Sequence, residues 1–183
     1  MFRTLLLNLF FYIPVWFLRL VYLKKRTPIR GHMIDLQSSV ILDIMPKKDL
    51  TEVPDNSIKD TRDLIDKKRS QYRLSLKPTS KISKVDHDIC SQNSLALREY
   101  IPSELRSSKA ILYFHGGGYV ISSIETHDMM VSFMSDKIKT KFFSLEYRLS
   151  PENKYPDALD DALKAYKWLI SRGYSPENIS FCG

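Results

Sequence analysis

The residues best suited to chemistry are His115, Gly116, Gly117 and Gly118, four neighbours that directly follow an apolar run over residues 110–114. Three of the chain's six glycines lie in this motif. Because glycine has no Cβ atom, the backbone there can adopt positive φ and come close to a ligand. Its free N–H groups can converge on one point, as the stabilisation of a developing oxyanion requires.

Two other interpretations of the glycine motif remain open at this point. One is a tight strand-to-helix turn, which the glycines alone favour as strongly as an oxyanion site. The other is a phosphate-binding loop, which is disfavoured because no GKS or GKT sequence follows the glycines and no GxGxxG pattern is present.

A second motif follows the next predicted strand. Residues 146–152 have the sequence EYRLSPE, and residues 155–161 have the sequence YPDALDD at the start of an amphipathic helix. Together with HGGG, and in this order, these motifs resemble the hormone-sensitive-lipase-like branch of the α/β-hydrolases, which includes the arylacetamide deacetylases. The resemblance extends over residues 57–183 and is densest from residue 110 onwards.

The resemblance implies a serine carboxylic-ester hydrolase of lipase, esterase or deacetylase type that acts on lipophilic small esters, with no cofactor and no metal ion. A Ser-His-Asp triad would cleave the ester while the glycine loop binds the oxyanion. By motif position, Gly117 and Gly118 would donate the N–H groups of the oxyanion hole. His115 and Gly116 would shape the loop.

Two charged residues of the second motif, Arg148 and Glu152, are assigned a structural role. We hypothesise that they belong to an Arg–carboxylate network behind the glycine loop. The alternative is that both lie on a solvated face, where ion pairs contribute little to stability.

The resemblance ends before the catalytic serine. In this family a Gly-Asp-Ser-Ala-Gly nucleophile elbow should follow the strand predicted at residues 179–182, and Gly183 occupies the place of its first glycine. We expect the triad serine, acid and histidine to lie beyond Gly183. GYSPE at residues 173–177 is no substitute, because it lacks the final glycine of GxSxG and precedes a strand. Ordinary core or surface positions are expected for His32, His87, His127 and Cys182.

We therefore expect the chain alone to be inactive and poorly soluble, because the helices and strands that should cover one side of the sheet would be missing and an apolar parallel edge would be open. It would be the front part of a membrane-anchored serine esterase. The alternative is a non-catalytic, membrane-tethered protein that binds a ligand or another protein. Neither the oligomeric state nor the substrate's identity follows from the sequence.

Alternating strands and helices are predicted to position these motifs. The expected elements are a hairpin over residues 85–90 and 95–100, strands at 110–114, 142–147 and 179–182, and helices at 126–138 and 156–170. This alternation indicates an α/β fold with a mostly parallel sheet and helices on its faces, here an α/β-hydrolase fold truncated just before the nucleophile elbow. The last helix carries an apolar stripe expected to face a core, formed by Leu159, Ala162, Leu163, Tyr166, Leu169 and Ile170.

Residues 1–26 are predicted to be a membrane anchor. The largely apolar run over residues 4–23 has about the length of a membrane-spanning helix, although Asn8, Pro14 and Arg19 interrupt it. An interfacial helix and a buried core helix are the alternatives. A cleaved signal peptide is disfavoured because no small-residue cleavage site follows.

The charge pattern agrees with a membrane location. The chain has a net charge of +7, and residues 1–83 hold 16 basic against 8 acidic residues. This excess lies beside the apolar run, so it suits an anionic membrane surface, and no nucleic-acid-binding motif accompanies it. More basic residues follow the run than precede it, so the positive-inside rule favours a cytosolic domain. The endoplasmic reticulum is one candidate membrane.

The remainder of the chain is predicted to contain two parts. Residues 27–83 would be a connector with a cap-like helix at residues 57–72, and residues 84–183 would be the N-terminal part of the hydrolase domain. A composition of 43% hydrophobic and 27% charged residues excludes a collagen-like or mostly disordered chain. Two cysteines and four scattered histidines indicate neither a disulfide framework nor a zinc site.

Overall fold

The structure is a computed structural model that describes residues 13–21, 33–44, 58–63, 80–90 and 94–183. The chain divides into two compact units, one formed by residues 1–57 and 72–75 and the other by residues 58–71 and 76–183.

The described part of the first unit contains two short helices, α2 (Val15–Val21) and α3 (Leu36–Ile44). Leu18 of α2 is buried, whereas Trp16 and Leu20 of the same helix are exposed. Across the described residues of the chain, no helix is long and apolar enough to cross a membrane.

The membrane anchor expected at residues 4–23 falls mostly outside the described residues, which include only 13–21 of that run. The helix found there has seven residues, whereas a membrane-spanning helix needs about 20. The described residues contain no membrane-spanning helix, and the anchor stays a prediction. Of the helix predicted at residues 57–72, the structure describes a helical segment at 58–63.

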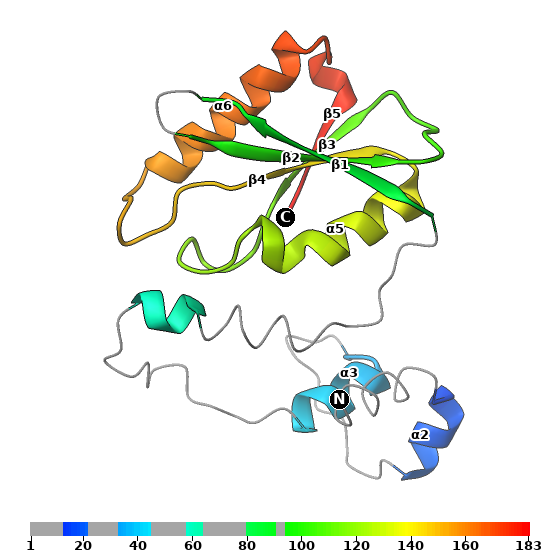
Figure 1. Cartoon of the computed structure of the whole chain (residues 1–183). Helices are drawn as coiled ribbons and strands as arrows, with labels where there is room; N and C mark the ends of the chain where they lie inside the picture. Colours follow the sequence, from blue (N-terminus) through cyan, green and yellow to red (C-terminus); the bar gives the residue numbers. More distant parts are fainter. Residues whose placement is uncertain (1–12, 22–32, 45–57, 64–79, 91–93) are drawn as a thin grey trace. The chain divides into compact units, whose positions relative to one another are not determined.

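The second unit is built on a five-stranded sheet with the strand order β1-β2-β4-β3-β5 (Figure 1). Its strands are β1 (Ile82–Asp88), β2 (Ala96–Pro102), β3 (Ala110–Phe114), β4 (Lys141–Leu145) and β5 (Ile179–Cys182). Its helices are α5 (Ile124–Ile138), α6 (Asp157–Ser171) and the 3₁₀ turn η1 (Pro176–Asn178). The predicted α/β class and the predicted hairpin, β1 with β2, are confirmed.

The sheet is mixed rather than mostly parallel as predicted. β3 pairs in parallel with both β4 and β5, because α5 and α6 are the crossover connections between these strands. The hairpin adds its second strand to the free edge of β4, and this pairing is antiparallel. Half of the sheet's pairings are thus antiparallel, and the parallel half carries the glycine motif.

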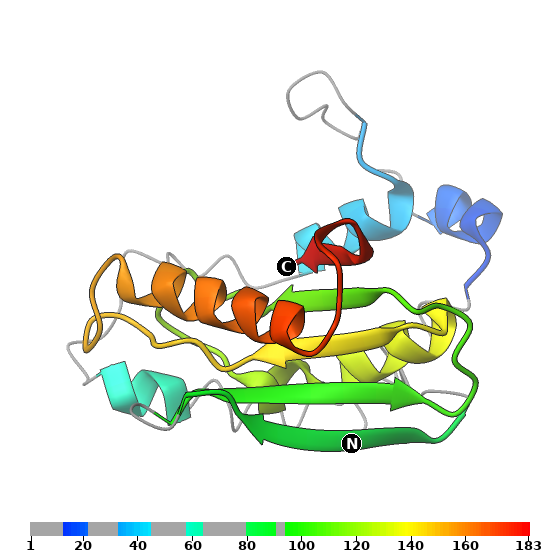
Figure 2. The ribbon, with the colours of Figure 1, turned by 90° about the horizontal axis from the view of Figure 1, so that it is seen from above.

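The alternation of side chains along each strand divides the core into two clusters on opposite faces of the sheet. On the face covered by α6, Leu112 and Phe143 pack with Leu169 of the helix. On the other face, Tyr113 and Phe142 pack with Val131 of α5. Figure 2 shows the two helices on either side of the sheet.

The apolar stripe predicted for α6 is only partly buried. Ala165 and Leu169 are buried, whereas Leu159 and Leu163 are about half exposed, at 50% and 48%. The buried face instead centres on Asp161, whose side chain is held by Arg148 from the loop after β4. That ion pair and the small Ala165 bring this face of the helix against the sheet, which turns the leucines outward.

Candidate active site

The glycine motif lies in the loop that joins β3 to α5, at the carboxyl end of the parallel strands. The loop after β4, residues 146–156, emerges at the same edge, and so does Gly183 after β5. Ligands of open α/β sheets bind outside the carboxyl ends of the strands. The sheet therefore brings the two sequence motifs to one location where a ligand can bind.

The conformation of the loop requires glycine at two of its three glycine positions. Gly117 has a φ of +137°, and a Cβ atom added there would lie 2.0 Å from the carbonyl oxygen of Ile121. Gly118 has a φ of +62°, in the left-handed region, with open space around it. The N–H groups of Val120 and Ile121 both donate to the carbonyl oxygen of Gly117, at 3.1 and 3.2 Å. These bonds close a tight turn.

The turn leaves backbone donors available. Among the described residues, no hydrogen bond occupies the N–H group of Gly117 or Gly118. Both glycines line a cavity of about 810 Å³, together with the loop after β4, the start of α6 and Gly183. Unoccupied N–H groups beside a cavity are the donors that an anion or a polarised carbonyl oxygen needs.

His115 occupies a buried position at the start of the loop. Its ring stacks on that of Tyr147, with centroids 4.2 Å apart and planes inclined by 14°. The Tyr147 hydroxyl donates to the carbonyl oxygen of His115. Burial raises the pKa of Tyr147 to about 12, so the hydroxyl keeps its proton and remains a donor at neutral pH. The contact ties the start of the glycine loop to the residues that follow β4.

Replacing Tyr147 by phenylalanine should lower the free energy of unfolding by about 1 to 2 kcal/mol, because the carbonyl oxygen of buried His115 loses its donor while the ring stacking remains. Urea denaturation followed by circular dichroism measures the change. Tyr155→Phe is the matched control, because the Tyr155 side chain is 87% exposed, and it should leave stability within about 0.5 kcal/mol. Equal losses in both variants would contradict the role of the Tyr147 hydroxyl.

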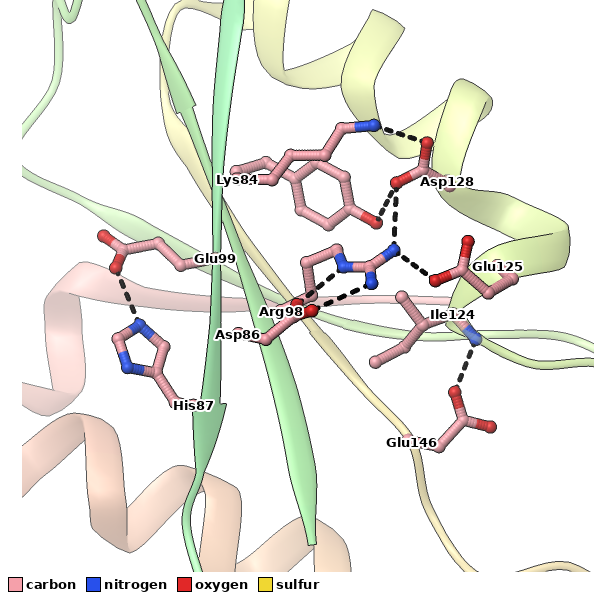
Figure 3. Close-up of polar contacts among 10 residues, drawn as sticks. Lys84, Asp86, His87, Arg98, Glu99, Ile124, Glu125, Asp128 and Glu146 are labelled. Carbon is pink, nitrogen blue, oxygen red and sulfur yellow. Dashed lines mark hydrogen bonds and ion pairs between the residues drawn. The ribbon is translucent and has the colours of Figure 1, made fainter.

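The far end of the loop is fixed at the start of α5. Ser123 and Thr126 form a capping box, in which each side chain bonds the other residue's backbone N–H group. Glu146, the first residue after β4, accepts a hydrogen bond of 2.7 Å from the N–H group of Ile124 (Figure 3). A carboxylate beside the helix N-terminus is also favoured by the helix dipole. The first residue of EYRLSPE thus anchors the helix that follows HGGG.

The hypothesis of an Arg–carboxylate network behind the loop needs correction, because Arg148 and Glu152 have separate partners. Arg148 donates two hydrogen bonds of 2.8 Å to the buried carboxylate of Asp161, and a third of 3.0 Å to Asp157. Glu152 is paired with Arg62, at 2.8 Å. The sequence motif therefore contributes to two networks, one in α6 and one in the helical segment at residues 58–63.

Arg62 is the residue of this region that sequence reasoning missed. Its guanidinium reaches the carbonyl oxygens of Val120 and Ser150, both at 2.7 Å, as well as Glu152. Arg62 lies within the cap-like helix predicted at residues 57–72. Nothing in the spacing of that helix singles Arg62 out from its other basic residues.

Other charged clusters of the second unit are structural. Arg98 of β2 makes a bidentate pair with Asp86 at 2.7 and 3.0 Å, and it also contacts Glu125 and Asp128 of α5 (Figure 3). These pairs join α5 to the hairpin. Within the part of the chain that the structure describes, no group of three or more His, Cys, Asp or Glu side chains is placed to hold a metal ion.

Comparison with known proteins agrees with this geometry. The family described as alpha/beta hydrolase fold matches residues 111–183. An esterase from the bacterial hormone-sensitive lipase family superposes with a TM-score of 0.60 at 29% identity, over 72% of this chain and 42% of that one. Residues 111–183 thus match the α/β-hydrolase fold family and are similar to an esterase of the hormone-sensitive-lipase family. This family includes carboxylesterases and lipases.

Two curated relatives of this segment are named as enzymes that cleave esters. Ethyl acetate hydrolase from Pseudomonas putida is 35% identical over 83 residues, which are 44% of this chain and 26% of that protein. Versiconal hemiacetal acetate esterase from Emericella nidulans is 37% identical over 86 residues, 47% of this chain and 30% of that protein. The Francisella virulence factor BioJ superposes with a TM-score of 0.64 at 32% identity, over 78% of this chain and 48% of BioJ. This chain thus spans less than half the length of each of these proteins.

Proposed function

We propose that this chain forms the oxyanion-hole side of a serine carboxylic-ester hydrolase that acts on lipophilic small esters. The observation that carries the proposal is the pair of unoccupied N–H groups of Gly117 and Gly118 beside the cavity. In α/β-hydrolases, one oxyanion donor comes from the loop after β3, which is where this motif lies.

In the proposed reaction, a serine hydroxyl attacks the ester carbonyl carbon and a histidine takes the hydroxyl proton. The carbonyl oxygen becomes negatively charged, and the glycine N–H groups stabilise it more strongly than they stabilise the neutral ester. The tetrahedral intermediate then expels the alcohol, which takes its proton from the histidine. Water repeats the sequence on the acyl-enzyme and releases the acid.

The position of Gly183 supports the same proposal. A Cβ atom added there would lie 2.9 Å from the carbonyl oxygen of Phe114, so the chain passes close to the end of β3 only because this residue is glycine. Gly183 lines the same cavity as the glycine loop. A nucleophile supplied within a few residues of Gly183 would face the two N–H groups.

The lining of the cavity supports a lipophilic substrate. Its walls include Val120, Tyr147, Leu159 and Ala162, and Lys154 is the only Lys, Arg, Asp or Glu among the lining residues that the structure describes. A mostly apolar wall with a few backbone donors favours an uncharged ester over a phosphorylated or dicarboxylic substrate.

The proposal is tested on the natural gene product, captured with an antibody against residues 100–183. Intact mass, hydrolysis of p-nitrophenyl butyrate and labelling by a fluorophosphonate probe are measured on the captured protein. Labelling and hydrolysis by a species heavier than 21.4 kDa would support the proposal. A species that neither labels nor hydrolyses the ester would overturn it, and would favour the non-catalytic, ligand-binding alternative.

We further propose that residues 1–26 attach the protein to a membrane, with the endoplasmic reticulum as the first candidate. Support comes from the apolar run at residues 4–23 and from the exposed Trp16 and Leu20 on α2, since exposed aromatic and aliphatic side chains suit the bilayer interface. Alkaline carbonate extraction of membranes should leave the full chain in the pellet and release a variant without residues 1–26. Release of both would overturn the proposal.

A further inference from the structure

Arg62 connects the two loops that line the cavity. Its Nε–H group donates to the carbonyl oxygen of Val120 at 2.7 Å, beside the glycine turn. One Nη group donates to the carbonyl oxygen of Ser150 at 2.7 Å, in the loop after β4. The two Nη groups hold both carboxylate oxygens of Glu152 at 2.9 and 2.8 Å. A single planar guanidinium therefore bonds both loops.

The geometry uses properties that only arginine has. The fork of the guanidinium fits a carboxylate in bidentate fashion, and its remaining donors stay in the same plane. The Arg62 side chain is 22% exposed, whereas that of Glu152 is 54% exposed. An isolated pair at such a surface contributes little. The two bonds to backbone carbonyl oxygens, rather than the ion pair, give the contact its structural effect.

The loop segment that Arg62 contacts has an unfavourable backbone conformation. Tyr119 has a φ of +62° and Ser122 a φ of +83°, both in the left-handed region although neither is glycine. Such residues persist only where their surroundings hold them. Val120, whose carbonyl oxygen Arg62 binds, lies between them, and the N–H group of Ser150 donates to the carbonyl oxygen of Tyr119 at 2.7 Å. The loop is therefore held from outside at two adjacent residues.

We propose that Arg62 is a positioning residue for the oxyanion loop: it ties Val120 to Ser150 and Glu152 and so keeps Gly117 and Gly118 in the conformation that leaves their N–H groups unoccupied. The effect on catalysis rests on the proposed function. The contact that holds the loop does not depend on catalysis. The residue touches no reacting atom and acts through the loop.

Hydrogen exchange of the purified natural gene product, measured by mass spectrometry, tests the contact without any substrate. In Arg62→Met, the amide hydrogens of Val120, Ile121 and Ser150 should exchange about tenfold faster, because the bonds that hold them open more often. Amides of β3 and β4 should be unchanged. Unchanged exchange in the two loops of the variant would overturn the proposal.

Three further variants separate positioning from general destabilisation. Arg106→Met removes an arginine that is 74% exposed and pairs only weakly with Glu104, at 3.4 Å, and it should leave loop exchange unchanged. Arg62→Lys should restore protection only in part, because an ammonium group cannot form the fork. In Arg62→Ala, millimolar guanidinium should slow exchange again, whereas sodium at equal concentration should not. Failure of both the lysine variant and guanidinium to restore any protection would contradict the assigned bonds.

Catalysis provides the second readout in the natural gene product. Arg62→Met should lower kcat for p-nitrophenyl butyrate about tenfold to a hundredfold with KM within about twofold, because misplaced donors act on the transition state and not on substrate binding. An unchanged kcat together with faster loop exchange would overturn the positioning role. It would show that Arg62 only holds the two loops together. If the wild-type protein hydrolyses no ester, the proposed function fails, and the exchange result still decides whether Arg62 holds the loop.

Discussion

Gly117→Ala should be among the most damaging single substitutions in this protein. The new Cβ atom would lie 2.0 Å from the carbonyl oxygen of Ile121, and the φ of +137° is one that residues with side chains rarely adopt. The obstacle is backbone, so it cannot move aside as a side chain can. We expect the free energy of unfolding to fall by about 3 kcal/mol. In the natural gene product, displacement of the donors should reduce hydrolysis of p-nitrophenyl butyrate by about 10² to 10³-fold.

The same triplet supplies matched controls for this substitution. A Cβ atom at Gly116 meets nothing within 4 Å, so Gly116→Ala should change stability by less than about 1 kcal/mol. Gly118→Ala has space but a φ of +62°, so an intermediate loss of about 1 kcal/mol is expected. Urea denaturation of the three variants gives the order. Similar losses at Gly116 and Gly117 would contradict the turn geometry on which the oxyanion proposal depends.

The second large effect is expected at Arg148, whose removal leaves a buried carboxylate without its main partner. The Asp161 side chain is 1% exposed and accepts two guanidinium hydrogen bonds, both 2.8 Å. Arg148→Met should therefore cost about 3 to 5 kcal/mol of unfolding free energy. Lys164→Met is the control, since Lys164 is 38% exposed and 3.5 Å from the same carboxylate, and it should cost less than about 1 kcal/mol.

The pH dependence of the Arg148 effect has a definite sign. Burial raises the pKa of Asp161, but the hydrogen bonds from Arg148 lower it more, so the pKa lies below its ordinary value of 3.8. The stabilisation is therefore complete above the unfolded-state pKa and is lost as the pH falls through the lower, folded-state pKa. In Arg148→Met the folded-state pKa of Asp161 rises. Acidification therefore lowers the free energy of unfolding of the variant less than that of the wild type.

Unfolding free energies of the wild type and Arg148→Met, measured at pH 7, 5 and 4, test this sign. The difference between the two proteins should be largest at pH 7 and should shrink towards pH 4. A difference that stays constant or grows on acidification would show that the loss has a cause other than the uncompensated carboxylate.

The sequence was most informative about strands and helices whose bounds depend on residues close together in the chain. The strands at residues 110–114 and 179–182 were predicted with their observed bounds. Both runs have the length of a strand and are too short for a typical helix, and the first is continuously apolar. The predicted helices at residues 126–138 and 156–170 lie within about two residues of α5 and α6 at each end. Their start and stop signals are local.

Two predictions were wrong, one of them only in part, where they depended on which neighbour an element packs against. The mostly parallel sheet was wrong because a hairpin's own pattern does not reveal that β2 will pair with β4 in antiparallel orientation. The apolar stripe of α6 was assigned to the core by spacing alone. In the structure Leu159 and Leu163 are about half exposed, since the helix face is set by Asp161 and its contact with Arg148.

The sequence by itself determined that His115, Gly116, Gly117 and Gly118 follow a buried strand, and the structure shows why two of these glycines are required: their φ values are positive. A requirement for positive φ is local, and it appears in the sequence as a glycine at that position. Only the tertiary structure decided which distant groups hold the loop, because Arg62 and Glu152 are 90 residues apart in the chain. The sequence does not show which partner a charged side chain will bind. That partner is determined only when the sheet brings the two loops together.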